Sequence, residues 1–200
     1  MEAYLIICSY YTNDIYMRHA AELKKSLETF GLRFEIDQLT DLGSWMKNVQ
    51  QKPAFIRSKM EKHKEETIVW LDADCVVRAR PELLLGDLAC DVAGFSARYQ
   101  GDIWGSTLLF RPTDAARTVV ANWDLRVQDR PDWQDNLSLK FAIAIDTPAA
   151  KLVQIPATYA WTEWIMRSWE PKARPVVEHL AVEAKRRMDD RSAPTGAKHK

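Results

Sequence analysis

The pattern of apolar and polar positions divides this chain into short apolar runs and longer amphipathic segments. Continuous apolar runs, which are typical of strands buried on both faces, occur at 4–9, 68–71, 91–97, 107–110 and 151–155. Apolar residues at helical spacing predict helices over 15–30, 53–63, 113–127 and 137–143. The segment 33–37 alternates apolar and polar residues and predicts one more strand.

The order strand, helix, strand at the N-terminus predicts a β-α-β unit and therefore a pair of parallel strands. We expect an α/β fold, namely a single domain with a mostly parallel central sheet flanked by helices. The 200 residues are enough for one well-buried domain, to which we assign 1–188. The polar and basic tail, 189–200, is expected to be disordered.

The stretch TIVWLDADCVV at 67–77 carries the first candidate chemistry. Asp72 and Asp74 directly follow a buried strand, and an extended backbone would send both side chains to the same side. Open α/β sheets bind ligands at the carboxyl ends of their strands, and a hard cation held by few carboxylates keeps positions open for substrate phosphates. The stretch therefore predicts a cation site for a nucleoside diphosphate, with a solvated turn or a helix cap as the alternative.

Composition narrows the choice of partners. Lys plus Arg and Asp plus Glu both number 28, so the net charge is zero and does not indicate a surface that coats nucleic acid or membranes. Three cysteines without a C-x-x-C spacing argue against a disulfide framework and a zinc site. This cysteine usage favours a reduced compartment, and the expected location is the cytoplasm. The N-terminus does not resemble a signal peptide, and no apolar run approaches membrane-spanning length.

Five segments in order resemble the GT-A glycosyltransferases, the nucleotide-diphospho-sugar transferases whose signature strand ends in D-x-D. They are KPAFIR at 52–57, VWLDADCVV at 69–77, WGSTLLFR at 104–111, WQDNLSL at 133–139 and EHLAVEAK at 178–185. The resemblance implies a GT-A-like fold and the transfer of a sugar from a nucleotide-diphosphate sugar to an acceptor hydroxyl. The favoured donor is a UDP-sugar, the metal is Mn²⁺ or Mg²⁺, and the acceptor is a glycan, a protein or a modified nucleobase.

Carried onto this sequence, the resemblance implies that Asp74 ligates the metal directly and that Asp72 contacts the metal or the ribose. His179 would complete the metal site, and the alternative for it is a hydrogen-bonded core histidine. Lys52 and Arg57 would contact the nucleotide or the pyrophosphate of the donor, or else be exposed helix charges.

The resemblance also implies contacts to the two ends of the donor. Gly105 and Ser106 would approach the sugar closely, because glycine has no side chain in the way. Tyr10, Tyr11 and Thr12 stand at the end of the first strand, where such folds receive the nucleotide base.

Asp135 is the implied carboxylate near the reacting sugar, with a helix N-cap as its alternative. In an inverting enzyme it would deprotonate the acceptor, whereas in a retaining enzyme, the outcome we favour, it would stabilise positive charge at the anomeric carbon. The acceptor is expected at the C-terminal third, where Trp161, Trp164 and Trp169 offer stacking planes.

Three other functions compete with this interpretation. Haloacid-dehalogenase-like phosphatases also begin with a strand ending in D-x-D, and GDLACD at 86–91 matches their later motif, but it follows Asp74 too closely for the intervening segments to fold. A nucleotidyltransferase would carry a glycine-rich loop where this chain has SYYTND at 9–14. A non-catalytic module that binds nucleotide sugars stays open.

Overall fold

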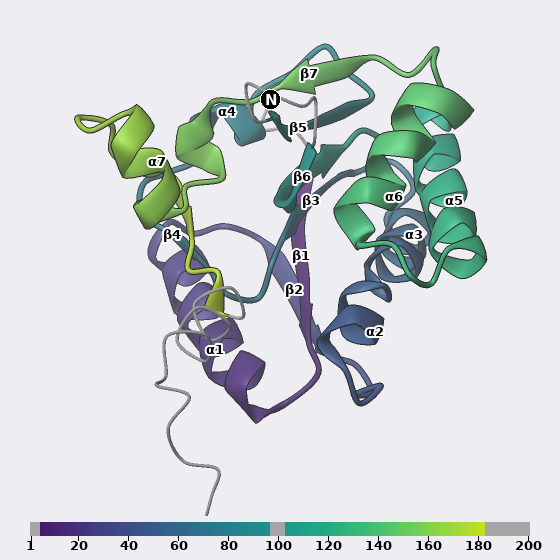
Figure 1. Ribbon diagram of the computed structural model, residues 1–200. Helices are drawn as coiled ribbons and strands as arrows, with labels where there is room; N and C mark the ends of the chain where they lie inside the picture. The colour runs from purple at the N-terminus through teal and green to yellow at the C-terminus, as the bar shows by residue number, and fades with distance from the viewer. Residues whose placement is uncertain (1–4, 97–102, 183–200) are drawn as a thin grey trace, which may run out of the picture.

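The computed structural model describes residues 5–96 and 103–182, so the tail assigned to 189–200 lies outside the described residues. A six-stranded sheet in the order β2-β1-β3-β6-β5-β7 forms the centre of the molecule (Figure 1). Its strands are β1 (Leu5–Tyr11), β2 (Phe34–Gln38), β3 (Thr67–Leu71), β5 (Val92–Ser96), β6 (Ile103–Phe110) and β7 (Leu152–Gln154). Because β6 alone in this sheet runs antiparallel to its neighbours, the prediction of an α/β fold with a mostly parallel sheet is confirmed.

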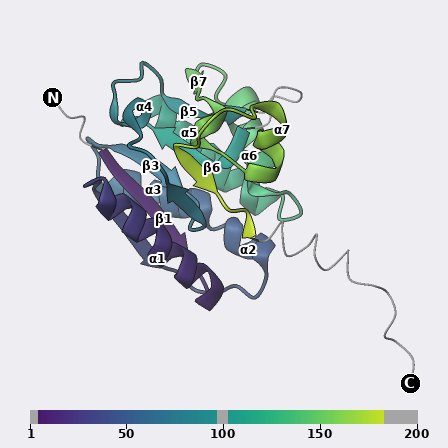
Figure 2. The same ribbon diagram turned by 90° about the vertical axis from the view of Figure 1, so that its left-hand side faces the viewer.

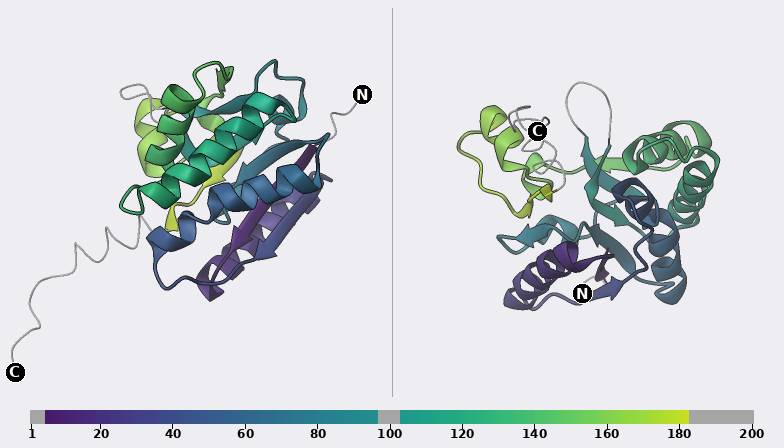
Figure 3. Two further views of the ribbon diagram at one scale, coloured as in Figure 1. Left: turned by 90° about the vertical axis from the view of Figure 1, so that its right-hand side faces the viewer. Right: turned by 60° about the horizontal axis from the view of Figure 1, so that its bottom comes forward.

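Helices cover both faces of the sheet. They are α1 (Asp14–Thr29) on one face, and α3 (Lys52–Lys62), α5 (Asp114–Asp129) and α6 (Asp135–Phe141) on the other (Figures 1 and 3). The central strand β3 contributes side chains to the core on both faces of the sheet. Val69 and Leu71 point into the core under α1, whereas Ile68 and Trp70 point into the core under α3 and α5. This two-sided burial explains why the strand 68–71 is a continuous apolar run.

The first helix begins and ends where local chemistry predicts. The Asn13 side chain caps α1 by accepting a hydrogen bond from the Tyr16 N–H, and Gly31 adopts a positive φ of 62° just after its end. Leu23 and Leu27 are fully buried on the inner face of the helix. The helix therefore lies along β1, as Figure 2 shows, and its first turn lies close to the end of that strand.

Several short elements complete the described chain. They are α2 (Trp45–Val49), β4 (Cys75–Val77), α4 (Glu82–Leu85), a π-helical turn (Ala142–Asp146), a 3₁₀ turn (Ala157–Tyr159), α7 (Glu163–Trp169) and β8 (Val177–His179). The strands β4 and β8 pair as a second, antiparallel sheet in which Cys75 lies opposite His179. Neither strand is predicted from the sequence, because three residues are too few to show a period.

Two boundaries differ from the prediction. The strand expected at 107–110 begins at Ile103, so Gly105 and Ser106 belong to β6 itself. Its register with β5 shifts between Gly94 and Ser96, an irregularity of the bulge type that re-aims side chains next to functional sites. The helix expected at 137–143 begins at Asp135.

All three cysteines are free and buried, as expected from the absence of a disulfide pattern. Within residues 5–96 and 103–182, no helix is both long enough and apolar enough to cross a membrane.

Glu35 on β2 gives the fold a defined pH dependence. Its carboxylate contacts Lys59 at 2.5 Å, Lys62 at 2.6 Å and His63 at 3.1 Å. Burial alone would raise the pKa of Glu35, but these partners outweigh it and lower the pKa from 4.5 to about 2. Because the folded pKa is the lower one, these contacts stabilise the fold above pH 4.5, and this contribution is lost as the pH falls towards about 2.

We therefore expect the variant Glu35→Gln to be less stable than the wild type in urea denaturation at pH 7. The difference should shrink as the pH falls below 4.5, because the wild-type carboxylate then becomes protonated as well. Glu61→Gln serves as the control, since Glu61 is an exposed residue of α3, the helix that carries Lys59 and Lys62. A destabilisation by Glu35→Gln that stays constant across this pH range would contradict the assignment.

Candidate active site

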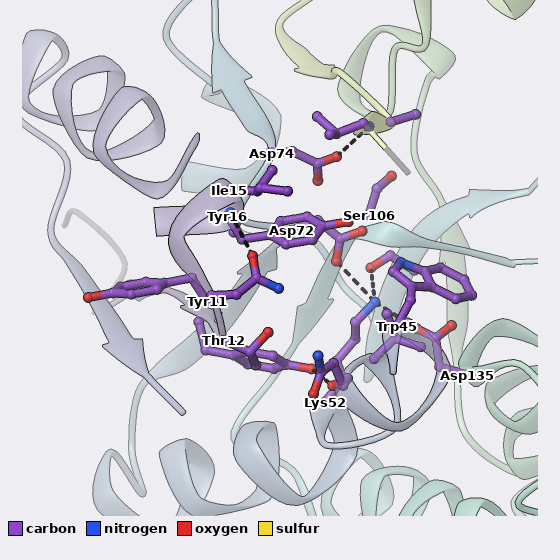
Figure 4. A pocket seen from close by; sticks show the side chains of 18 of the residues that line it. Tyr11, Thr12, Ile15, Tyr16, Trp45, Lys52, Asp72, Asp74, Ser106 and Asp135 are labelled. Atoms are coloured by element: carbon purple, nitrogen blue, oxygen red, sulfur yellow. Dashed lines mark hydrogen bonds and ion pairs between the residues drawn. The ribbon is translucent and has the colours of Figure 1, made fainter. Parts of the chain in front are cut away.

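A cavity of about 450 Å³ lies at the carboxyl ends of β1 and β3, and residues from the start of α1, α2, α3 and α6 also line it (Figure 4). The sequence-predicted site residues that line it are Tyr10, Tyr11, Thr12, Lys52, Asp72, Asp74, Gly105, Ser106, Asp135 and His179. These side chains come from six separate parts of the chain. The fold therefore brings them to one place, as expected for the carboxyl edge of an open sheet.

Arg57 and the C-terminal tryptophans lie elsewhere. The Arg57 guanidinium forms an ion pair with Asp124 of α5 at 2.7 Å and does not line the cavity, so it is left out of the proposed site. Trp161 is fully buried and offers no stacking plane to an acceptor. Trp164 and Trp169 belong to α7 and are partly exposed, but they do not line the cavity either.

Asp72, Asp74 and His179 form a cluster that could hold a metal ion. One ligand atom from each residue lies within 4.8 Å of the other two. The His179 Nε2 atom is 3.3 Å from Asp74 Oδ1 and 3.6 Å from Asp72 Oδ2. The pairing of β4 with β8 creates this arrangement, because it lays the His179 strand beside the D-x-D segment. Two carboxylates and an imidazole suit Mn²⁺, and the residues thus fit the implied metal.

The charges of this cluster perturb one another. Burial raises the pKa of Asp72 above its usual range, although Lys52 and His179 oppose the shift. Burial would also raise the pKa of Asp74, but His179 and the Val182 N–H outweigh it and lower the pKa to about 2. For His179, burial is outweighed by Asp74 and Asp72, and the pKa is raised. Because a ligating imidazole must be neutral, His179 would release its proton on binding a cation.

Lys52, the first residue of α3, is buried at the centre of the cavity wall. Its ammonium group donates to the Gly105 carbonyl at 3.1 Å and to Asp135 Oδ2 at 2.7 Å, and lies 3.0 Å from Asp72 Oδ1 (Figure 4). Burial alone would lower the pKa of Lys52, but Asp135 and Asp72 outweigh it and raise the pKa. Its three N–H groups thus have three protein oxygens as partners, and an additional contact to a diphosphate would have to replace one of them.

Asp135 is held by the same ammonium group of Lys52 that contacts Asp72. It is the first residue of α6, and Gln134 takes the N-cap position that the sequence left open for Asp135. The backbone carbonyl of Asp135 accepts a hydrogen bond from the buried Trp123 indole at 2.9 Å. This side chain is buried, lines the cavity and pairs with Lys52, and so belongs to the cavity and not to the helix cap.

Asn136 belongs to the site, although the sequence analysis does not single it out. Its Oδ1 atom accepts a hydrogen bond from the Gly105 N–H at 2.9 Å, which leaves the amide nitrogen as the group that can donate elsewhere. The neighbouring Ser106 hydroxyl is buried and lacks a hydrogen-bond partner among the described residues. The start of β6 therefore presents two unused polar groups beside Asp135, a feature visible only once the strand register is known.

The other end of the cavity is built by the end of β1 and by α2. Tyr10 donates to the Asn48 carbonyl at 2.6 Å, and the Asn48 side chain is held in turn by Asp41 and the Leu42 N–H. Trp45 of α2 also lines the cavity. Residues 38–52 show no clear period, so the sequence predicted only a short helical piece in a loop there.

No family model matches the sequence, and no curated protein matches it either. Solved structures do resemble it, including the following three. A glycosyltransferase involved in the glycosylation of the major capsid of PBCV-1 superposes with a TM-score of 0.69 at 14% identity, over 93% of this chain and 98% of its own. The protein has a glycosyltransferase fold.

Two structures of the glycosyltransferase GlyE from Streptococcus pneumoniae TIGR4 agree with this result. They superpose with TM-scores of 0.57 and, for the apo form, 0.55, at 13% and 12% identity. In both cases 90% of this chain is covered, but only 54% of GlyE. The chain thus spans about half the length of GlyE and nearly all of the PBCV-1 enzyme. The GT-A fold implied by the sequence is confirmed.

A substitution at Gly105 tests how tightly this cavity wall is packed. A Cβ atom there would lie 2.5 Å from Asn136 Oδ1, 3.1 Å from Lys52 Nζ and 3.2 Å from Asp135 Oδ2. We therefore expect Gly105→Ala to lower the free energy of unfolding by about 1–3 kcal/mol and to weaken binding of the donor expected from the sequence, a UDP-sugar. Urea denaturation and calorimetry measure the two effects.

The matched control is Gly94→Ala in the adjacent strand. A Cβ at Gly94 would lie 3.0 Å from apolar atoms of Ile103 and Leu108, so it crowds the core outside the cavity. It should lower stability and leave binding unchanged. Equal binding by the Gly105 and Gly94 variants would show that the contacts around Gly105 do not shape the ligand site.

Proposed function

We propose that this protein is a metal-dependent glycosyltransferase, which moves a sugar from a nucleotide-diphosphate sugar to an acceptor hydroxyl. The observation that carries the proposal is the Asp72, Asp74 and His179 cluster, which lies in the same cavity as the buried Asp135. The fold supports it, since the PBCV-1 structure and GlyE are both described as glycosyltransferases.

Asp72, Asp74 and His179 would hold Mn²⁺ or Mg²⁺ in this enzyme. A cation bound there supplies Lewis-acid stabilisation of the diphosphate as it leaves. In each carboxylate, one oxygen accepts a hydrogen bond from the protein. Asp74 Oδ2 accepts it from the Val182 N–H, and Asp72 Oδ1 accepts it from the Trp70 indole N–H. The other oxygen of each carboxylate faces His179. The protein thereby fixes the orientation of both carboxylates without using up their ligand atoms.

Asp135 would act on the reacting sugar. Lys52 holds one of its oxygens, and through the same ammonium group Asp135 is tied to Asp72. A carboxylate fixed in this way suits electrostatic stabilisation of positive charge at the anomeric carbon, the role that it has in a retaining enzyme. We therefore prefer retention to inversion, in which Asp135 would have to accept a proton from the acceptor.

The remaining lining residues would bind the donor and the acceptor. The Ser106 hydroxyl and the Asn136 amide nitrogen would face the sugar. Figure 4 shows Tyr11 and Thr12 across the cavity from Asp135, and these two residues would contact the base of a UDP-sugar. Trp45 lines the same cavity and is a more suitable stacking plane for an acceptor than the buried Trp161. Glycans, proteins and modified nucleobases are all acceptors with the hydroxyl or other nucleophile required.

The phosphatase alternative is disfavoured by the position of its second motif. Asp91 accepts hydrogen bonds from the Thr113 hydroxyl and the Lys151 N–H just before β5 begins. The start of β5 pairs with the end of β6, and that end pairs with the start of β3, whereas Asp72 follows the end of β3. The two acidic motifs therefore lie at opposite ends of the strands and cannot act on one phosphate.

The metal requirement is tested with a panel of nucleotide sugars, with and without Mn²⁺. We expect one donor to bind and to be hydrolysed slowly only when metal is present, and Asp74→Ala to abolish both effects because a ligand is lost. Asp87→Ala is the control, since Asp87 is exposed and lies outside the cavity. Metal-independent binding, or cleavage of a generic phosphate ester instead, would refute the proposal.

Asp135→Asn separates an enzyme from a non-catalytic binding module. The amide keeps the shape of the side chain but removes its charge, so donor affinity should change little while turnover falls about 100-fold or more. Asp124→Asn is a close control, because Asp124 is also buried and paired with a cation, Arg57, but lies outside the cavity. Equal turnover in the two variants would remove Asp135 from the mechanism.

A further inference from the structure

We propose that Ala181 is a positioning residue for the metal site, whose left-handed backbone conformation aims the Val182 N–H at the carboxylate of Asp74. This inference rests on the proposed function, because it concerns how a ligand of the proposed cation is held. Ala181 itself provides no ligand atom, and no role is predicted for it from the sequence, although it lies within the segment EHLAVEAK at 178–185.

The backbone at Ala181 is unusual. Among the residues that the structure describes, it is the one non-glycine residue with a positive φ, which is 48°. The Cβ atom makes this left-handed region costly for alanine, and such conformations persist where the surrounding structure imposes them. Ala181 is also buried and lines the cavity, so the conformation does not belong to an exposed surface turn.

The contacts on either side of Ala181 show what imposes the conformation. Before it, the Leu180 N–H donates to the backbone carbonyl of Asp74 at 2.9 Å. After it, the Val182 N–H donates to Oδ2 of the same aspartate at 3.0 Å, across 108 positions of sequence (Figure 4). The two N–H groups that flank Ala181 therefore both donate to Asp74, one to its backbone and one to its side chain, and the left-handed conformation of Ala181 sets the direction of the second.

This turn connects two of the three proposed ligands. His179 ends β8, where its N–H donates to the Trp161 carbonyl at 2.7 Å, and the turn follows at once. With Oδ2 of Asp74 held by Val182, Oδ1 is left 3.3 Å from His179 Nε2. The left-handed turn thus fixes the rotation of the Asp74 carboxyl group relative to the imidazole. Groups that orient metal ligands in this way change metal affinity by about 10- to 100-fold when they are lost.

Two substitutions at Ala181 separate the backbone effect from the side chain. Ala181→Gly removes the methyl group but favours the left-handed conformation, so Mn²⁺ affinity should stay within about twofold of the wild type. Ala181→Val adds a branched Cβ that resists this conformation, and affinity should fall about tenfold or more. Mn²⁺ binding without nucleotide, followed by electron paramagnetic resonance, gives these affinities independently of turnover.

Hydrogen exchange gives a second measurement that needs no metal. The Val182 amide should be protected in the wild type and in Ala181→Gly, and should exchange faster in Ala181→Val because its bond to Asp74 is lost. Ala116→Val is the control for crowding, since Ala116 of α5 is fully buried in the core under α3 and α5, on the face of the sheet opposite α1. This variant should lose stability but keep wild-type Mn²⁺ affinity and protection at Val182.

The outcomes distinguish a failure of the proposed function from a failure of the role assigned to Ala181. If the wild type bound no Mn²⁺, or bound it equally well as Asp74→Ala, the proposed function would fail. If the wild type bound Mn²⁺ through Asp74 but the valine and glycine variants had the same affinity, only the role of Ala181 would be wrong. Loss of affinity in Ala116→Val comparable to that in Ala181→Val would likewise assign the effect to general destabilisation.

Discussion

The buried ammonium group of Lys52 is the interaction on which the cavity depends. It contacts Asp72 at the metal cluster, Asp135 at the start of α6 and the carbonyl of Gly105 in β6. Removing one partner of a buried ion pair typically costs about 3–5 kcal/mol, because the other charge is left uncompensated. A single cation therefore sets the relative positions of three elements and keeps two like-charged carboxylates in one cavity.

The rest of the site is arranged around this lysine by two features of the backbone. The irregular pairing of β5 with β6 places Gly105 and Ser106 at the cavity wall, where the absence of a Cβ at Gly105 lets Asn136, Lys52 and Asp135 approach. The pairing of β4 with β8 brings His179 from the far end of the described chain to the D-x-D segment. The Asp72, Asp74 and His179 cluster and the candidate catalytic carboxylate thus share one framework, which is consistent with the proposed metal binding and sugar transfer in one cavity.

The sequence predicted those parts of the molecule that depend on local patterns. The apolar run at 68–71 located the centre of the sheet, because a strand buried on both faces leaves a clear signal. The two carboxylates after it belong to the Asp72, Asp74 and His179 cluster. Arg57 was placed in the site because it shares a segment with Lys52. Five residues along a helix correspond to about 140° around its axis, and Arg57 therefore faces α5 instead of the cavity.

What the sequence could not predict depends on contacts between distant segments. Asn136 is marked only by its bond to the Gly105 N–H, and Ala181 only by a backbone angle that no residue type encodes. The strands β4 and β8 are too short to show a period, although their pairing decides where His179 lies. Such features become visible when the register of the strands is known.

The most direct test of the proposed metal site is the position of Mn²⁺ in a crystal of the protein, located by anomalous scattering in the presence of a nucleoside diphosphate. We predict one strong peak between the carboxylates of Asp72 and Asp74 and the Nε2 atom of His179, with diphosphate oxygens completing its coordination. A metal peak elsewhere, or a bound nucleotide whose diphosphate lies away from these three side chains, would contradict this prediction.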